Sequence, residues 1–252
     1  MTFHIVTLFP RAFDSYLGES ILKRAIEDKK IRVKFYNPRD FIYPERSRGA
    51  GKKKDRRIDK KPYGGGPGVV IQALPVIKAV EAVLKDSGFR IQGSRKSKVK
   101  SQKSNVKMVW LSPSGKQFTN EYGKKLARKC TDIVIICGRY EGIDARVKKV
   151  INTTSIRESG RMTRMKAEEV SVGPYVLTGG ELPAMIMIDA ISRQVAGVLG
   201  DFNSIEESRV ASSDVYTRPE VFEYHGKKYR VPKILLSGHR AKIDGWRSKR
   251  KK

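Results

Sequence analysis

The sequence contains few of the residues that build metal sites or nucleophilic triads. Two cysteines and three histidines occur among its 252 residues. The spacing of Cys130 and Cys137 matches neither a CxxC motif nor a zinc cluster, so we predict two packed thiols in a reducing compartment. His4, His225 and His239 fall in unrelated segments, which disfavours a metal site or a histidine-based triad.

Other absences narrow the function classes further. The chain has no GxxxxGK[ST] motif, and no GxGxxG motif follows a predicted strand, which disfavours ATP-driven and dinucleotide chemistry. No apolar run approaches the length of a membrane span, and the N-terminal stretch lacks a cationic leader before an apolar core. We therefore expect a cytoplasmic protein without a membrane partner.

Acidic residues are scarce relative to basic ones. The chain has 53 Lys and Arg against 26 Asp and Glu, a net charge of +27, with much of it in the segments 46–61, 90–107 and 239–252. Nucleic acid is the usual partner of such an excess, because basic side chains neutralise its phosphates. A basic proteome or a charged tail is the plainer alternative. An anionic membrane surface is disfavoured, since no long helix pairs a basic face with a continuous apolar one.

Hydrophobic periodicity predicts an α/β domain over residues 1–197, with a parallel sheet covered on both faces. The predicted strands are 3–9, 31–37, 107–113 and 132–138, and the predicted helices are 20–30, 73–87, 120–129 and 180–197. A polar linker, 198–215, then leads to a small basic module, 216–252. Within that module we predict a hairpin at 221–231 and a helix at 238–252.

Glycine-rich turns are the remaining candidates for a functional site. They are YGGGPG (63–68), LSPSG (111–115), CGRYEG (137–142) and VGPYVLTGGELPA (172–184). Taken singly, each reads as an ordinary turn between a strand and a helix. Because ligands of open α/β sheets bind beyond the carboxyl ends of strands, several such loops can converge on one pocket. Without a phosphate motif, they indicate a ligand held by backbone groups.

These glycine-rich loops belong to a series of longer sequence motifs. In chain order they are LFP, PRDF, YGGGPG, LSPSG, CGRYEGID, VGPYVLTGGELPA, GVLG, YTRPEV and LLSGH. This series resembles the bacterial tRNA (guanine-N1)-methyltransferases, the TrmD family, over nearly the whole chain. The resemblance implies a SPOUT-type α/β fold with a deep C-terminal trefoil knot, followed here by a small, truncated module. It also implies a homodimer with active sites at the subunit interface, S-adenosyl-L-methionine as methyl donor, and N1 of guanosine 37 in tRNA, rather than DNA, as the target.

The resemblance assigns roles to residues at matching positions. The expected cofactor-binding residues are Leu111, Pro113, Gly138, Tyr140, Glu141, Val172, Gly173, Pro174, Tyr175, Val176, Leu177, Gly179, Gly180 and Pro183. The expected substrate-binding residues are Tyr63, Gly64, Gly65, Gly66, Pro67 and Gly68. Arg193, in ISRQVAGVLG, matches the catalytic arginine, whose guanidinium would stabilise negative charge on guanine O6.

The general base of the family has no unambiguous counterpart in this sequence. The family has an aspartate in an EDS-like triplet after GVLG, and this chain reads IEESRVASSDVYTRP. Matching the triplet selects Glu207, counting without a gap reaches Ser208, and the shorter linker leaves Asp214 open as an alternative. We choose Glu207, because a carboxylate can take the N1 proton and a serine alone cannot. Pro174 also departs from the family, which commonly has an aspartate there.

The motifs do not assign a role to magnesium, to the basic insertions or to the segment 152–166. Family behaviour suggests a magnesium requirement, but the sequence shows no carboxylate cluster that would form a metal site. The basic insertions and the C-terminal tail are expected to supply phosphate contacts. The segment 152–166 looks inserted. A dimer or RNA contact and a tolerated surface loop are the two alternatives, and we favour the surface loop. The alternative functions are a SPOUT methyltransferase with another RNA target and a non-catalytic RNA-binding relative.

Overall fold

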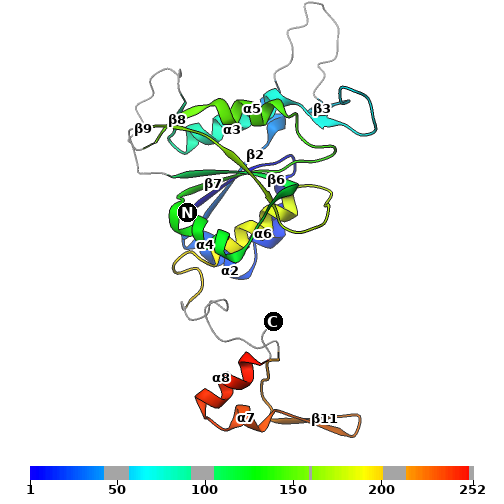
Figure 1. The fold of residues 1–252 in the computed structure, drawn as a ribbon, viewed down its shortest axis with the longest axis vertical. Coiled ribbons are helices and arrows are strands. Elements are labelled where there is room, and N and C mark those ends of the chain that lie inside the picture. The colour runs from blue at the N-terminus through cyan, green and yellow to red at the C-terminus, as the bar shows by residue number, and fades with distance from the viewer. Residues whose placement is uncertain (43–56, 92–104, 159–160, 201–213, 250–252) are drawn as a thin grey trace, which may run out of the picture. The chain divides into compact units, whose positions relative to one another are not determined.

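The chain forms two compact units, Met1–Val198 and Leu199–Lys252, and each is described by itself. The computed structural model describes residues 1–42, 57–91, 105–158, 161–200 and 214–249 (Figure 1). Glu207, most of the predicted linker and large parts of the basic segments 46–61 and 90–107 lie outside these residues. In the described parts, no helix combines the length and the hydrophobicity needed to cross a membrane.

A five-stranded parallel sheet forms the centre of the first unit. Its strand order is β10-β6-β7-β1-β2, and every neighbouring pair is parallel. The strands are β1 (Thr2–Val6), β2 (Arg32–Tyr36), β6 (Val106–Gln117), β7 (Asp132–Ile136) and β10 (Ala167–Ser171). The middle strands are rich in buried Val and Ile on both faces, as expected when helices cover a parallel sheet on both sides. The prediction of an α/β fold with a parallel sheet is confirmed.

Helices cover both faces of this sheet (Figure 1). One core cluster joins the sheet to α3 and α5, and a second joins the opposite face to α1, α2, α4 and α6. These helices are α1 (Asp14–Leu17), α2 (Ser20–Glu27), α3 (Ala73–Asp86), α4 (Asn120–Lys129), α5 (Arg146–Thr153) and α6 (Glu181–Ser192). Short elements complete the unit: η1 (Pro10–Phe13), η2 (Pro38–Phe41), β3 (Asp59–Lys60), β4 (Val70–Ile71), β5 (Arg90–Ile91), β8 (Ser155–Glu158) and β9 (Arg161–Arg164).

Strand β10 is an element that the sequence pattern does not predict. Its residues, AEEVS, place two acids side by side, which breaks the apolar alternation of a strand. Lysines from neighbouring elements neutralise both acids, since Lys107 pairs with Glu168, and Lys148 lies 2.6 Å from Glu169. The strand therefore depends on tertiary contacts that its local sequence does not show.

The segment 152–166 is not the surface loop we expected. It contains the antiparallel hairpin β8–β9, which pairs with β5 in a separate small sheet. Ile156 and Met165 are buried and belong to the core cluster under α3 and α5. The prediction was wrong because these two apolar residues stand alone in a polar context, where periodicity gives no signal.

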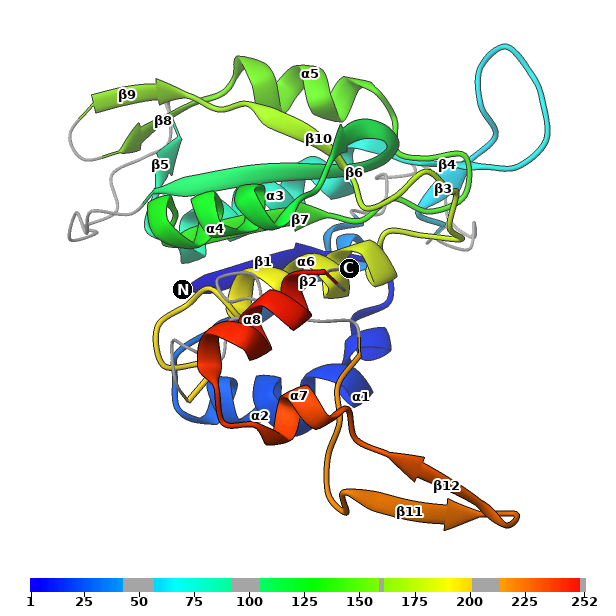
Figure 2. The same cartoon turned by 60° about the horizontal axis from the view of Figure 1, so that its bottom comes forward.

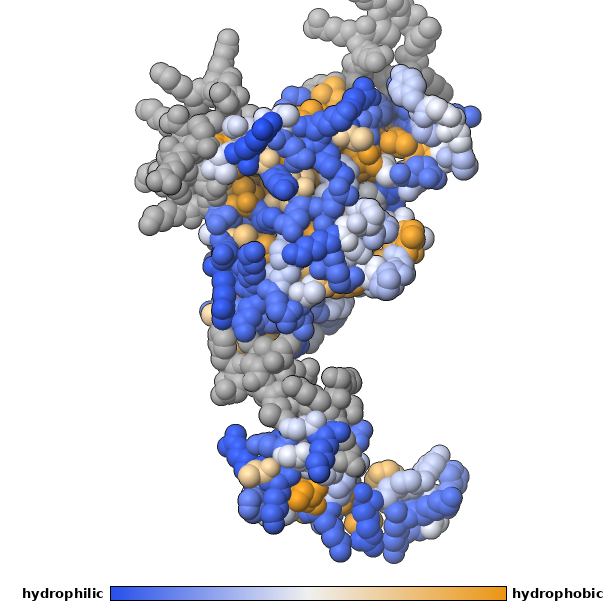
Figure 3. Space-filling model, in the orientation of Figure 1, coloured by the Kyte–Doolittle hydropathy of each residue, from blue (hydrophilic) through white to orange (hydrophobic). Residues whose placement is uncertain are grey.

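The second unit has little interior. It contains the hairpin strands β11 (Val221–Tyr224) and β12 (Lys227–Arg230), followed by α7 (Lys233–Leu236) and α8 (Arg240–Ser248) (Figure 2). The rings of Tyr216 and Trp246 lie 6.2 Å apart between centroids and join the start of the unit to α8. None of the described residues 214–249 is buried. Hydrophilic residues dominate the face of both units that Figure 3 shows.

Candidate active site

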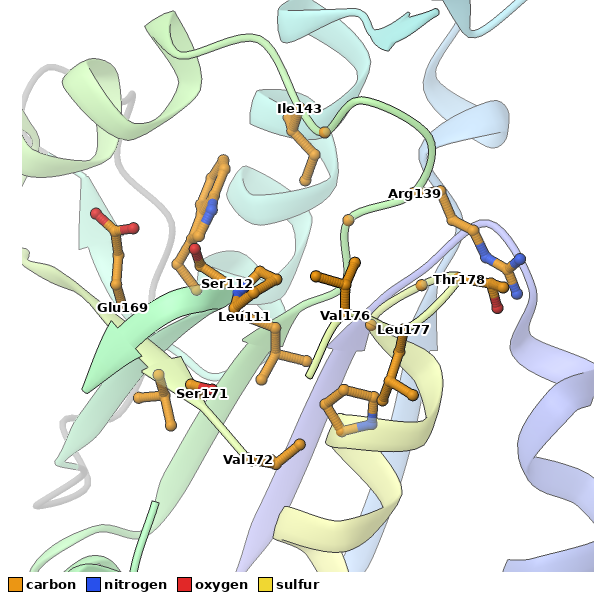
Figure 4. Close-up of a pocket in the computed structure, with 18 of the residues that line it drawn as sticks. Leu111, Ser112, Arg139, Ile143, Glu169, Ser171, Val172, Val176, Leu177 and Thr178 are labelled. Atoms are coloured by element: carbon orange, nitrogen blue, oxygen red, sulfur yellow. The ribbon is translucent and has the colours of Figure 1, made fainter. Parts of the chain in front are cut away.

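A pocket of about 420 Å³ opens where β7 and β10 end and β6 leaves its regular pairing. Every predicted cofactor-binding residue except Pro174 lines it. In Figure 4, Leu111, Val176 and Leu177 gather between β6 and the start of α6, with Glu169 and Arg139 toward opposite sides of this group. Loops from three distant parts of the sequence thus meet in one cavity.

The LSPSG motif forms a bulge inside β6, which corrects the prediction of a turn after a strand. The β10 partner of β6 jumps from Trp110 to Lys116 between Glu169 and Val170, so residues 111–115 leave the ladder. At the end of this bulge, a Cβ on Gly115 would lie 2.5 Å from the backbone nitrogen of Val170. Only glycine allows the two backbones to approach this closely.

A second backbone contact joins the CGRYEG loop to the start of α6. The Gly180 nitrogen donates a hydrogen bond to the Gly138 carbonyl over 2.9 Å, and Arg139 and Gly179 form an isolated antiparallel bridge. A Cβ on Gly180 would lie 2.6 Å from the Cα of Cys137. The need for glycine at position 180 therefore comes from the neighbouring backbone, since its own φ of −81° suits any residue.

A buried carboxylate fixes the same two loops together. Glu181 is 4% exposed, and its two oxygens accept hydrogen bonds from Thr7 Oγ1 at 2.8 Å and Arg139 Nε at 3.1 Å. The Arg139 guanidinium also stacks on Phe9, 4.5 Å from the ring centroid. Burial, assisted by the charge of Glu181, raises the pKa of the Cys137 thiol, which therefore stays protonated. This network holds one wall of the pocket in a fixed position.

The far end of the CGRYEG loop is strained and exposed. Tyr140 lines the pocket with a φ of 59° and is 52% exposed, and a positive φ is uncommon for a residue with a Cβ. Such strain persists where surrounding contacts impose it, often at functional sites. Here the flanking backbone is held by hydrogen bonds from Glu141 N to Val69 O and from Ile71 N to Gly142 O.

The YGGGPG segment lies beside the pocket and does not line it. All six residues are exposed, and Gly64, Gly65, Gly66 and Gly68 have positive φ. Gly68 packs against the side chain of Glu141, which lines the pocket. The segment thus reaches the pocket wall and leaves Tyr63 entirely exposed.

The opposite wall contains residues that the motifs did not point to. Lys148 Nζ lies 5.1 Å from the centroid of the Trp110 ring and 2.6 Å from Glu169 Oε1. These three residues come from α5, β6 and β10, and all line the pocket. No spacing in the sequence links them, because β10 and α5 are both absent from the predicted elements.

Two further predicted residues of the first unit do not line the pocket. Pro174 is exposed and does not line it. Arg193 caps the C-terminal end of α6, while the pocket is at the N-terminal end. At the rise of an α-helix, Arg193 lies about 15 Å along the axis from Pro183, which lines the pocket. Asp214 is exposed in the second unit, and Glu207 lies outside the described residues.

Comparisons with known proteins identify the family. The family model described as "tRNA (Guanine-1)-methyltransferase TrmD" matches residues 1–252. The chain belongs to this family. Three similar proteins are each named "tRNA (guanine-N(1)-)-methyltransferase". That of Clostridioides difficile is 38% identical, over 98% of this chain and 90% of the relative. That of Caldanaerobacter subterraneus is 41% identical, over 98% and 85%. That of Carboxydothermus hydrogenoformans is 38% identical, over 99% and 82%. The resemblance read from the motifs is confirmed.

The pocket suits the methyl donor that the TrmD family implies. Its volume falls within the range of roughly 300–1,000 Å³ typical of small-molecule sites. Apolar side chains such as Leu111, Ile143 and Leu177 offer a slot for an adenine ring, and the Lys148–Glu169 ion pair offers a polar wall for amino-acid groups. Among the described residues, no group of three or more His, Cys, Asp or Glu is placed to hold a metal ion.

The backbone contact at Gly180 leads to a test of stability. We expect Gly180→Ala to lower the free energy of unfolding by about 1–3 kcal/mol, because the added methyl must displace the Cys137 backbone. Gly138→Ala is the matched control, since its Cβ would meet only Ile143, at 3.9 Å. Denaturant unfolding of the two variants would show the difference, and equal stability would refute the steric role of Gly180.

Proposed function

We propose that this chain transfers a methyl group from S-adenosyl-L-methionine to N1 of guanosine 37 in tRNA. This proposal rests on the match of the TrmD family model to the whole chain and on the pocket that the glycine-rich loops form. The excess of basic residues suits a tRNA substrate, and we expect the protein to act in the cytoplasm.

The cofactor would occupy the pocket lined by the bulge of β6, the CGRYEG loop and the loop before α6. S-adenosyl-L-methionine supplies the electrophilic methyl group when bound. The residues proposed to hold it are those predicted from the sequence, from Leu111 to Pro183, except Pro174, which does not line the pocket. The backbone contacts at Gly115 and Gly180 support the deep trefoil knot that the family implies, because a knotted chain must bring its own backbone into such contact.

The chemistry needs a base and a cation. Guanine N1 carries a proton and is a poor nucleophile while it does, so a carboxylate must accept that proton. Negative charge then develops on O6, where an arginine can stabilise it with its fork of donors. We assign the first role to Glu207 and the second to Arg193. The exposed glycines of YGGGPG would leave room for the target nucleotide beside Glu141.

The position of Arg193 supports a homodimer with shared active sites. Leu182 and Ile186 are 55% and 42% exposed, and with Asp189 and Arg193 they form one stripe along α6. An exposed apolar stripe on a helix with buried neighbours suits contact with a second copy. Since Arg193 lies about 15 Å along the helix from Pro183, a lining residue of its own pocket, it would act in the partner's pocket.

The second unit and magnesium have proposed roles in binding the tRNA. We assign residues 216–252 to a short tRNA-binding module, joined by the linker 198–215 to the domain 1–197. Magnesium would act on the tRNA or at a site formed only with it. Omitting magnesium and adding a chelator would test this requirement.

Methyl transfer to defined transcripts tests the function. The protein, labelled S-adenosyl-L-methionine and tRNA transcripts with G or A at position 37 would be incubated together. Labelling of the G37 transcript alone is expected. Labelling of both transcripts would instead support a methyltransferase with another RNA target, and labelling of neither would support a non-catalytic RNA-binding relative.

The assignment of the base can be tested separately. Because general acid–base catalysis contributes about 10²–10⁴-fold, Glu207→Gln should slow single-turnover methylation within that range. Asp214→Asn is the matched control and should leave the rate near the wild-type value. An unaffected rate for Glu207→Gln would contradict the assignment, and a loss confined to Asp214→Asn would transfer the role.

Shared active sites predict complementation between inactive variants. Gly138→Leu would block the pocket without a backbone collision, because position 138 has room for a Cβ. Co-expressed with Arg193→Ala, it should yield mixed dimers with one intact site, and about a quarter of wild-type activity if subunits pair at random. Either variant alone should be inactive. No recovery in the purified mixed dimer would place Arg193 and the pocket of one chain in the same site.

A further inference from the structure

One face of the β11–β12 hairpin carries three exposed aromatic side chains. Phe222 pairs with Tyr229 across the two strands, and Tyr224 pairs with Lys227. Because side chains alternate between the faces of a strand, these four residues share one face. The other face carries Val221, Glu223, Lys228 and Arg230. The aromatic face is therefore set by the register of the hairpin.

The aromatic side chains of this face are exposed and open to a partner. The rings of Phe222 and Tyr229 are stacked, with centroids 5.2 Å apart and an interplanar angle of 15°. Phe222, Tyr224 and Tyr229 are 55%, 62% and 46% exposed. A two-stranded hairpin is marginally stable by itself, so three aromatic side chains left on its surface require an explanation other than core packing.

The charge around this face fits a nucleic-acid partner. Residues 214–249 include nine Lys and Arg against four Asp and Glu. Lys227 lies on the aromatic face, and Lys228 and Arg230 lie on the opposite face of the same short strand. Aromatic side chains interleaved with basic ones are what single-stranded nucleic acid requires, with rings for the bases and cations for the phosphates.

We propose that Phe222, Tyr224 and Tyr229 form a stacking platform for unpaired nucleobases of the tRNA. This inference rests on the proposed function for its substrate. Stacking needs a base whose face is free, so the platform selects loop nucleotides over paired ones. Lys227 holds the adjoining phosphate. The hairpin thereby adds recognition of single-stranded structure to a module whose charge alone would not distinguish a loop from a helix.

Leucine substitutions separate stacking from charge. In the full-length chain, Phe222→Leu, Tyr224→Leu and Tyr229→Leu keep an apolar side chain and remove the ring. Equilibrium binding to a G37 tRNA transcript and to a fully paired RNA duplex would be measured by fluorescence anisotropy at several salt concentrations, without cofactor. Each lost base contact should weaken tRNA binding about tenfold, with the salt slope and duplex binding unchanged. Phe222→Tyr and Tyr229→Phe should restore affinity, which separates loss of the ring from loss of the fold.

Glu223→Gln, on the opposite face, is the matched control and should not weaken tRNA binding. Unchanged affinity in the leucine variants, equal losses for tRNA and duplex, or no tRNA binding by the wild-type protein would each overturn the platform. A change in oligomeric mass by light scattering, without a change in tRNA affinity, would instead assign the face to contact with a second copy. Since binding is measured without methyl transfer, an inactive protein that binds through these rings would refute the proposed function alone.

Discussion

The close approach of backbone to backbone at two glycines is the constraint on which the pocket depends. At Gly115 the bulge of β6 lies against β10, and at Gly180 the start of α6 lies against the end of β7. A side chain at either point would separate the segments that form the walls. Once they are in contact, the lining residues converge without a dedicated motif for phosphate or metal. The backbone contacts therefore set the shape of the pocket, and the lining side chains then determine its chemistry.

Sequence patterns predicted the parts of the fold whose signal is local. The strands β1, β6 and β7 contain buried apolar runs, β2 alternates apolar with basic residues, and α2, α3 and α4 each bury one apolar face, while α6 is apolar on nearly every side. β10 and the β8–β9 hairpin have no such signal, since lysines on other elements neutralise the acids of β10 and two isolated apolar residues anchor the hairpin. Their stability comes from tertiary contacts that periodicity cannot show.

The candidate site likewise contains residues that the sequence predicts and residues that it does not. Motif resemblance reached the residues on the glycine-rich loops, but it missed Trp110, Lys148 and Glu169, which meet only when β10 and α5 are in place. Motif resemblance also does not show how far a residue of α6 lies from the pocket. The distance from Arg193 to the pocket of its own chain is set by the length of α6, which the motifs do not give. The proposed dimer follows from that geometry as much as from family membership.

The acids of β10 have a further consequence for the sheet as a whole. β10 is an edge strand, and an edge strand offers unpaired backbone groups to any other strand that it meets. Glu168 and Glu169 place two charged side chains on this edge, each matched by a lysine within the same unit. A second sheet that docked there would have to place its own edge strand beside these charged side chains. The charges on the edge next to the pocket thus disfavour aggregation through strand pairing.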